Sequence, residues 1–234
     1  MVSRDERYAR QTMLPEIGEE GQRRLAASSV LIVGLGGLGS AVAPYLTGAG
    51  VGRLGLADPD RVSASNLPRQ TLYTESQIGR PKPEAARERL AGLNAATRFD
   101  LYPEGLTAAN ARELVAGCDL VVDCCDNFAT RYLLDEVCAA VGRPWVYGSI
   151  GAFHGQVSLF NGPGGRRYTE LYPDREALCA LPPAAAGVLG PTPGVVGALE
   201  AAEAIKWLAG FGEPLDGRLL TLDLKTMQTE TIEF

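Results

Sequence analysis

The sequence predicts an α/β fold of the Rossmann-like, doubly wound type, with a mostly parallel sheet and antiparallel strands added at the C-terminal end. Three observations lead to this prediction. Short apolar runs alternate with amphipathic stretches from Ser28 to about Asn161, a glycine-rich turn follows the first run, and the runs after Gly151 alternate apolar with polar residues. The first pattern is typical of parallel strands joined by helices, and the last of half-buried antiparallel strands.

The expected elements follow from the spacing of apolar residues. Strands are predicted at 29–33, 53–57, 98–102, 120–124, 145–148, 156–160, 218–222 and 229–233, and helices at 38–49, 83–93, 108–116, 130–141 and 195–208. We expect a single domain made of an N-terminal helical arm (1–27), a nucleotide-binding core (28–160), a loop (161–193), and a helix with terminal strands (194–234). The loop is rich in Gly, Pro and Ala and long for a structureless connection, so we expect it to be functional or mobile.

Composition excludes several classes of protein. The 234 residues are 46% hydrophobic, which is enough for a sizeable core, and the net charge of -6 argues against a nucleic-acid partner. The N-terminus is charged and no apolar run has the length of a membrane span, so we expect a cytoplasmic protein with no membrane partner. Five cysteines, an odd number with no C-x-x-C pair, are expected to be reduced thiols.

A glycine-rich loop predicts a phosphate site. Gly34, Gly36, Gly37 and Gly39 follow the first strand and open a helix, where missing side chains let main-chain N–H groups approach an anion. Asp58 ends the second strand, in the position from which a carboxylate can bond ribose hydroxyls. These residues alone leave a dinucleotide and ATP equally open.

Further polar groups favour ATP. The segments Ser65-Asn-Leu-Pro-Arg-Gln, Gly79-Arg-Pro-Lys and Asp123-Cys-Cys-Asp-Asn supply two cations, an amide and an acid near successive strand ends. A nicotinamide dehydrogenase needs no such set directed at a polyphosphate. Nucleotidyl transfer needs cations on the developing charge and a carboxylate on Mg²⁺, so the set indicates ATP chemistry.

With these motifs the chain resembles the ThiF, MoeB and HesA family, the bacterial adenylyltransferases related to ubiquitin-activating enzymes. Arg7-Tyr-Ala-Arg-Gln, Val33-Gly-Leu-Gly-Gly-Leu-Gly, Ser65-Asn-Leu-Pro-Arg-Gln, Arg80-Pro-Lys, Asp123-Cys-Cys-Asp-Asn and Ala186-Gly-Val-Leu-Gly-Pro occur in the family's order, over nearly the whole chain. The resemblance implies ATP-dependent adenylation of a small ubiquitin-fold sulfur carrier ending in Gly-Gly, with release of pyrophosphate. It also implies a homodimer with shared active sites.

Carried over position by position, the resemblance implies roles for individual residues. Asp58 would hold the ribose, Asp126 would bind Mg²⁺, and Arg10 would reach into the site of the other subunit. The remaining nucleotide and phosphate contacts would come from Ser65, Asn66, Arg69, Gln70, Lys82 and Asn127. Of these residues, Arg10, Arg69, Lys82 and Asp126 would carry the catalysis by positioning and charge neutralisation.

The chain also departs from the family. Typical members hold a structural zinc with two C-x-x-C pairs that are missing here, so we predict no zinc. Pro183 stands where some members carry a cysteine that links covalently to the partner, and the nearby Cys179 is the candidate substitute. Cys118, Cys124, Cys125 and Cys138 lie in or beside apolar runs and are expected in the core.

Two other functions stay open from the sequence. One is an NAD-dependent oxidoreductase on the same fold, which would need neither Lys82 nor Asp126. The other is a catalytically silent scaffold of the family, suggested by the missing zinc ligands and by Pro183. Within the adenylation reading, the pathway could be molybdopterin synthesis, thiamine synthesis or another one that uses a sulfur carrier.

Overall fold

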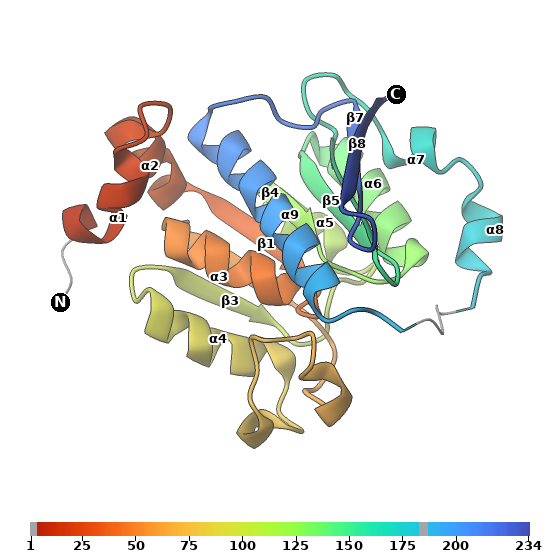
Figure 1. Cartoon of the computed structure of the whole chain (residues 1–234), viewed down its shortest axis with the longest axis horizontal. Coiled ribbons are helices and arrows are strands. Elements are labelled where there is room, and N and C mark those ends of the chain that lie inside the picture. Colours follow the sequence, from red (N-terminus) through yellow and green to blue (C-terminus); the bar gives the residue numbers. More distant parts are fainter. Residues whose placement is uncertain (1–3, 183–186) are drawn as a thin grey trace.

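A computed structural model describes residues 4–182 and 187–234. Within these ranges eight strands form one sheet in the order β3-β2-β1-β4-β5-β6-β7-β8 (Figure 1). The parallel part contains β1 (Ser29–Val33), β2 (Arg53–Ala57), β3 (Arg98–Tyr102), β4 (Leu120–Asp123) and β5 (Trp145–Ile150), and the antiparallel part β6 (His154–Phe160), β7 (Arg218–Asp223) and β8 (Gln228–Glu233). The predicted fold class is confirmed.

Helices cover both faces of the sheet (Figure 1). One face carries α3 (Gly39–Ala49), α4 (Lys82–Leu93) and α9 (Pro191–Ala209), and the other carries α5 (Ala111–Ala116) and α6 (Phe128–Val141). Successive strand residues point to opposite faces, so Val122 packs under α9 while Val121 packs under α6. Two apolar clusters, one on each face, therefore make up the core.

Two helices of the N-terminal arm lie at the amino end of β2, namely α1 (Arg4–Thr12) and α2 (Gly18–Ala27). Gln11 and Gln22 donate to the carbonyl of Ala49, at 3.2 and 2.9 Å, and the Tyr8 ring lies against Gly50. Gly50 has a φ of 88°, a conformation that favours glycine, and it ends α3. The arm is thus fixed to the end of α3 that faces away from the glycine-rich loop.

The observed helix ends differ from the predicted ones for local reasons. The helix expected from residue 108 begins at Ala111, because Thr107 and Asn110 form a turn in which the Thr107 N–H donates to Asn110 Oδ1 at 2.8 Å. The helix expected from 195 begins at Pro191, since proline is accepted in the first turn of a helix. β5 continues past its predicted end to Ile150, and β6 begins before its predicted start, at His154. The two strands are longer than predicted because they pair with each other in antiparallel fashion.

The segment 161–193, expected as an irregular loop, contains regular structure. It holds α7 (Tyr168–Leu171), α8 (Arg175–Cys179) and the first residues of α9. The buried carboxylate of Asp135 on α6 accepts hydrogen bonds from the Arg167 side chain, at 2.8 and 3.0 Å, and from the Tyr168 N–H, at 2.9 Å. These contacts and the buried Tyr168 ring dock α7 on α6, which composition alone did not indicate.

Candidate nucleotide-binding site

The predicted site residues gather where the parallel strands end. The chain leaves β1 toward α3 on one face, whereas it leaves β4, the neighbour of β1, toward α6 on the other. Ligands of doubly wound folds bind at such a switch point, outside the carboxyl ends of the strands. The glycine-rich loop directly follows β1, Asp58 directly follows β2, and Asp126 lies in the loop between β4 and α6.

Most positions of the glycine loop are glycine because other protein atoms lie too close to leave room for a Cβ. Gly34 has a φ of 96°, and a Cβ there would lie 2.5 Å from the carbonyl oxygen of Cys124. A Cβ on Gly37 would lie 2.7 Å from the Pro193 side chain, and one on Gly39 would overlap the Gly34 carbonyl. Gly36 differs, because its nearest neighbour would be Gln70 Nε2 at 3.6 Å. Its missing side chain therefore leaves open space for a ligand rather than room for the protein.

Asp58 and Lys82 form a buried pair at the end of β2. Lys82 Nζ lies 3.6 Å from Asp58 Oδ2 and 2.8 Å from Asp60 Oδ2. Asp58 also accepts hydrogen bonds from the main-chain N–H groups of Leu35, at 2.7 Å, and of Asp60, at 2.8 Å. Burial raises the pKa of Asp58 above its ordinary value of 3.8, and the charge of Lys82 opposes this shift. Asp58 thus ties the glycine loop to the only buried lysine among the described residues.

The segment after β2 contains four further predicted residues, Ser65, Asn66, Arg69 and Gln70, and its last two lie beside the glycine loop. Asn66 ends a 3₁₀ turn (Ala64–Asn66) and accepts from the Ser63 N–H at 3.1 Å, while Arg69 donates to the Ser65 carbonyl at 2.8 Å. Gln70 is 4% exposed and its Oε1 has no hydrogen-bond partner. A buried amide oxygen without a partner is costly, so this group fits beside a ligand that supplies a donor.

The end of β4 is built around a buried ion pair. Asp123 is fully buried, with Oδ2 3.3 Å from Arg131 Nε, and Arg131 also donates to the Cys125 carbonyl at 2.9 Å. Asp123 therefore orders this loop, whereas Asp126 is exposed at the sheet edge. Asn127, predicted as a nucleotide contact, is the N-cap of α6, because its Oδ1 accepts from the Thr130 N–H at 2.9 Å.

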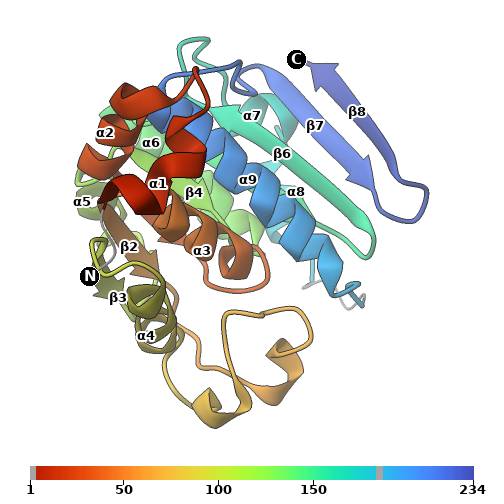
Figure 2. The ribbon, with the colours of Figure 1, turned by 60° about the vertical axis from the view of Figure 1, so that its left-hand side comes forward.

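Arg10 is not brought to these residues within one chain. It is exposed in the last turn of α1, at the amino end of β2, whereas the glycine loop lies at the carboxyl end of β1. Figure 2 shows α1 and the segment joining β2 to α4 on different sides of α3. Among the other predicted residues, Asp58 and Lys82 are in contact with each other, and Gln70 lies beside the glycine loop at Gly36.

The predicted core thiols are buried and unpaired: Cys118, Cys124, Cys125 and Cys138. Cys179 is exposed in α8, and Pro183 and Ala186 fall outside the residues that the structure describes. Residues 4–182 and 187–234 contain no group of three or more His, Cys, Asp or Glu that could hold a metal. The same ranges contain no helix with the length and apolar character of a membrane span.

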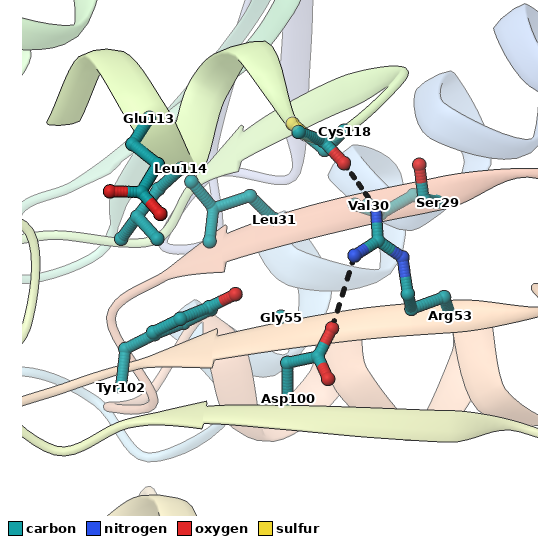
Figure 3. A pocket seen from close by; sticks show the side chains of 11 residues that line it. Ser29, Val30, Leu31, Arg53, Gly55, Asp100, Tyr102, Glu113, Leu114 and Cys118 are labelled. Carbon is teal, nitrogen blue, oxygen red and sulfur yellow. Dashed lines mark hydrogen bonds and ion pairs between the residues drawn. The ribbon is translucent and has the colours of Figure 1, made fainter. Parts of the chain in front are cut away.

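A separate cavity of about 210 Å³ lies on the α5 side of β1, β2 and β3 (Figure 3). Gly55 is at its floor, Tyr102 and Glu113 line it, and Arg53 crosses it to pair with Asp100 at 3.2 Å. It contains none of the predicted site residues. We therefore take the residues at the carboxyl ends of the strands, and not this cavity, as the candidate site.

The donor set at the strand ends fits a nucleotide triphosphate. The space at Gly36 is open, Lys82 and Arg69 are positively charged, and Asp126 offers one accessible carboxylate. Mg²⁺ in nucleotide sites is commonly bound by one or two carboxylates together with phosphate oxygens. A protein with this fold, and with these charged groups at the carboxyl ends of its parallel strands, is a nucleotide-binding protein of the Rossmann class.

Comparison with known proteins narrows the class. The ThiF family model matches residues 8–234, so this chain belongs to the ThiF family. The sulfur carrier protein adenylyltransferase of Thermus thermophilus is 49% identical over 224 residues, which cover 93% of this chain and 83% of that protein. The SAMP-activating enzyme E1 of Haloferax volcanii is 43% identical, covering 98% of this chain and 85% of that protein. The resemblance inferred from the motifs is confirmed.

Two further matches cover smaller parts of the proteins to which this chain is similar. The adenylyltransferase and sulfurtransferase MOCS3 of Mus musculus is 46% identical over 95% of this chain, but the chain spans only 49% of that protein. A crystal structure of E. coli MccB with ATP superposes with a TM-score of 0.86 over 97% of this chain and 71% of its own, at 22% identity. At that identity the second match supports the fold alone.

Proposed function

We propose that this protein uses ATP to adenylate the C-terminal carboxylate of a small ubiquitin-like sulfur carrier, releasing pyrophosphate. The observation that carries the proposal is the buried Lys82, held by Asp58 and Asp60, because Asp58 also accepts from the N–H of Leu35, the residue before Gly36 in the glycine loop. A phosphate entering that space would meet a cation already desolvated and oriented. The names of the relatives from T. thermophilus and H. volcanii agree with this activity.

The proposed chemistry needs no general base. A terminal carboxylate is ionised at neutral pH, so it can attack the α-phosphorus in line once both substrates are held. Lys82 and Arg69 neutralise charge on the phosphates, and main-chain N–H groups of the glycine loop orient them. Asp126 is the residue we expect to hold Mg²⁺, which when bound would supply further positive charge on the phosphates. Asp58 orients the ribose and fixes the loop.

We propose that the active unit is a homodimer in which Arg10 completes the partner's site. Arg10 is exposed and remote from the strand ends of its own chain. Met13 and Leu14 directly follow α1 and are 69% and 51% exposed, and Tyr45 on the neighbouring α3 is 58% exposed. Exposed apolar side chains around a remote cation are what a dimer contact would cover.

The partner and compartment follow from the same proposal. A glycine-ended tail suits a site beside the glycine loop, where Gly37 already lies close against Pro193, since it brings no side chain that would need room there. We expect a carrier ending in Gly-Gly and a cytoplasmic reaction, because free thiols such as Cys118 and Cys138 persist in reducing compartments. The downstream step would be formation of a thiocarboxylate on the carrier.

The direct test is to identify the product. The protein is incubated with ATP, Mg²⁺ and candidate carriers ending in Gly-Gly, and intact-protein mass spectrometry follows the carrier. A carrier whose mass grows by one adenylyl group, and only with its terminal glycine present, supports the proposal. Tight ATP binding with no adduct on any carrier would favour a silent scaffold, and NAD binding without ATP binding would favour an oxidoreductase.

A further inference from the structure

A fully buried carboxyl group lies on α9 beneath the candidate site. Glu200 has no exposed surface, and its carboxyl group lies directly against Gly148 of β5, in the space that a Cβ would fill. Cys124 donates a weak hydrogen bond to Glu200 Oε1 at a sulfur–oxygen distance of 4.0 Å, and Oε2 has no partner. None of the proposed catalytic steps uses this side chain.

The charges around Glu200 do not balance if it is ionised. The nearest cation, Arg131, is paired with Asp123, and no ion pair to Glu200 occurs within the described part of the chain. One guanidinium thus faces two buried carboxyl groups. An unpaired buried carboxylate is far more costly than its protonated form, so Glu200 is uncharged while Asp123 takes the cation.

Burial is also the main reason that the pKa of Glu200 lies well above its ordinary value of 4.5. The charge of Asp123 raises this pKa further, and Arg131 opposes the shift. Other charged groups on the surrounding elements are engaged or distant. On α9, Glu203 pairs with Lys206; on α2, Arg24 lies by Ala209 at the far end of α9; and on β6, His154 is exposed. No second cation is therefore available to Glu200 among these groups.

Glu200 sits where α9 meets the strand ends of the site. From the other face of the sheet, Arg131 donates to the carbonyl of Gly148 at 3.3 Å and to that of Cys125, the residue before Asp126, at 2.9 Å. Toward its N-terminus, α9 presents Pro193 to the glycine loop at Gly37. One helix thus joins the Glu200 contact at Gly148 to the wall of the glycine loop.

We propose that uncharged Glu200 is a positioning residue of the nucleotide site, which seats α9 against Gly148 and thereby holds Pro193 beside the glycine loop. The inference deepens the proposed function and rests on it for the identity of the nucleotide. An ionised or displaced carboxyl group would draw water to the strand end and move α9. Because α9 is one continuous helix from Pro191 to Ala209, the displacement would reach the glycine loop at Gly37.

The charge state is tested by unfolding wild type, Glu200→Gln and the control Glu203→Gln between pH 5 and 9. In the unfolded chain Glu200 ionises near pH 4.5, whereas burial in the fold raises its pKa well above that value. A raised folded pKa gives stability that is lost as pH rises toward that pKa. The wild-type unfolding constant should therefore rise about tenfold per pH unit relative to Glu200→Gln, which is about 1.4 kcal/mol. Parallel curves would overturn the proposal, as would the same divergence for Glu203→Gln.

The positioning role is tested by ATP binding, which requires no carrier and so can fail separately from the proposed reaction. Glu200→Asp keeps the acid but withdraws it from Gly148, and we expect its Kd for MgATP to rise about tenfold, as a small misplacement of a site can do. The separate variant Glu200→Gln, which keeps an uncharged group of the same length, should bind MgATP with the wild-type Kd. Leu208→Ala, a core truncation at the far end of α9, should lose stability with an unchanged Kd. Equal Kd values for Glu200→Asp and Leu208→Ala would overturn the role.

Discussion

The ammonium nitrogen of Lys82 lies 3.6 Å from a carboxylate oxygen of Asp58, and both side chains are buried at the carboxyl edge of the sheet. Asp58 in turn accepts from the Leu35 N–H in the glycine loop at 2.7 Å. A single chain of contacts therefore joins the cation, the acid after β2 and the loop after β1. Each member has a role in the fold as well as a proposed role toward ATP.

The first prediction separates these two roles of Lys82. Lys82→Met removes the cation that faces phosphate, and carrier-dependent adenylation should fall by about 10²–10³-fold. It also leaves Asp58 unpaired, so stability should fall by about 3–5 kcal/mol. Adding Asp58→Asn should recover stability without activity. Lys225→Met, at an exposed position between β7 and β8, is the matched control and should be silent. Retained activity in Lys82→Met would contradict the phosphate role.

The second prediction concerns the open position in the glycine loop. Gly36→Ala should fold normally, because its Cβ would come no closer than 3.6 Å to Gln70, yet its Kd for ATP should rise at least about tenfold as the methyl group blocks the ligand. Gly48→Ala, with open space around it in α3, should bind ATP normally and gain about 0.5–1 kcal/mol. Calorimetry and thermal unfolding give both quantities. Unchanged ATP affinity in Gly36→Ala would place the phosphates elsewhere.

A third prediction tests the shared active site. Arg10→Ala and Asp126→Ala should each be inactive, but refolding them together should restore up to about a quarter of the wild-type activity. The reason is that half of a random mixture is heterodimer and one of its two sites is intact, as two-fold symmetry requires. Size-exclusion chromatography checks the dimer. Failure to complement, with stable dimers present, would mean that Arg10 acts within its own chain or not at all.

The fourth prediction concerns the clasp between α6 and α7. Asp135→Ala removes the acceptor of Arg167 and of the Tyr168 N–H and leaves the Arg167 charge partly buried, so it should cost about 3 kcal/mol. Limited proteolysis should then cut residues 161–182 faster. The neighbouring Glu136→Ala loses only an exposed pair with Arg175 and should cost at most about 1 kcal/mol. Equal cleavage rates in the two variants would contradict the role of the Asp135 contacts in holding α7 against α6.

The fifth prediction concerns the thiols. Burial raises the pKa of Cys118 to about 11, and it likewise raises the pKa values of the Cys124, Cys125 and Cys138 thiols. Only Cys179 is exposed. Iodoacetamide at pH 8 should therefore modify Cys179 alone in the native protein and all five cysteines after unfolding. Native modification of a buried cysteine, mapped by peptide mass spectrometry, would show that the end of β4 opens.

Much of the parallel core followed from local pattern. The strand at 29–33 and the strand at 53–57 are observed with the predicted bounds, because a continuous branched-apolar run between turn residues has few other solutions. Asp58 and Lys82 were both predicted in the site, and the structure shows them in contact; the shared position of Arg69 stays a prediction. Both inferences use the order of elements rather than distances.

Pairings across the sequence were not accessible in this way. Asp60 as the second partner of Lys82 was missed, and its position two residues after Asp58 was the available signal. The clasp of Asp135 with Arg167 joins residues 32 apart, and the Glu200–Gly148 contact depends on the height of α9 over the sheet. Asn127 was placed in the site by its motif, and the structure adds that it is the N-cap of α6, a position that favours the same residue type; its contact with a nucleotide stays a prediction.

The most direct test of the account is ATP–pyrophosphate exchange with a carrier ending in Gly-Gly, compared with the same carrier lacking its last glycine. We predict exchange that needs the complete carrier and is lost in Asp126→Ala and in Lys82→Met. Exchange that is independent of the carrier, or that survives both substitutions, would contradict adenylation at this site.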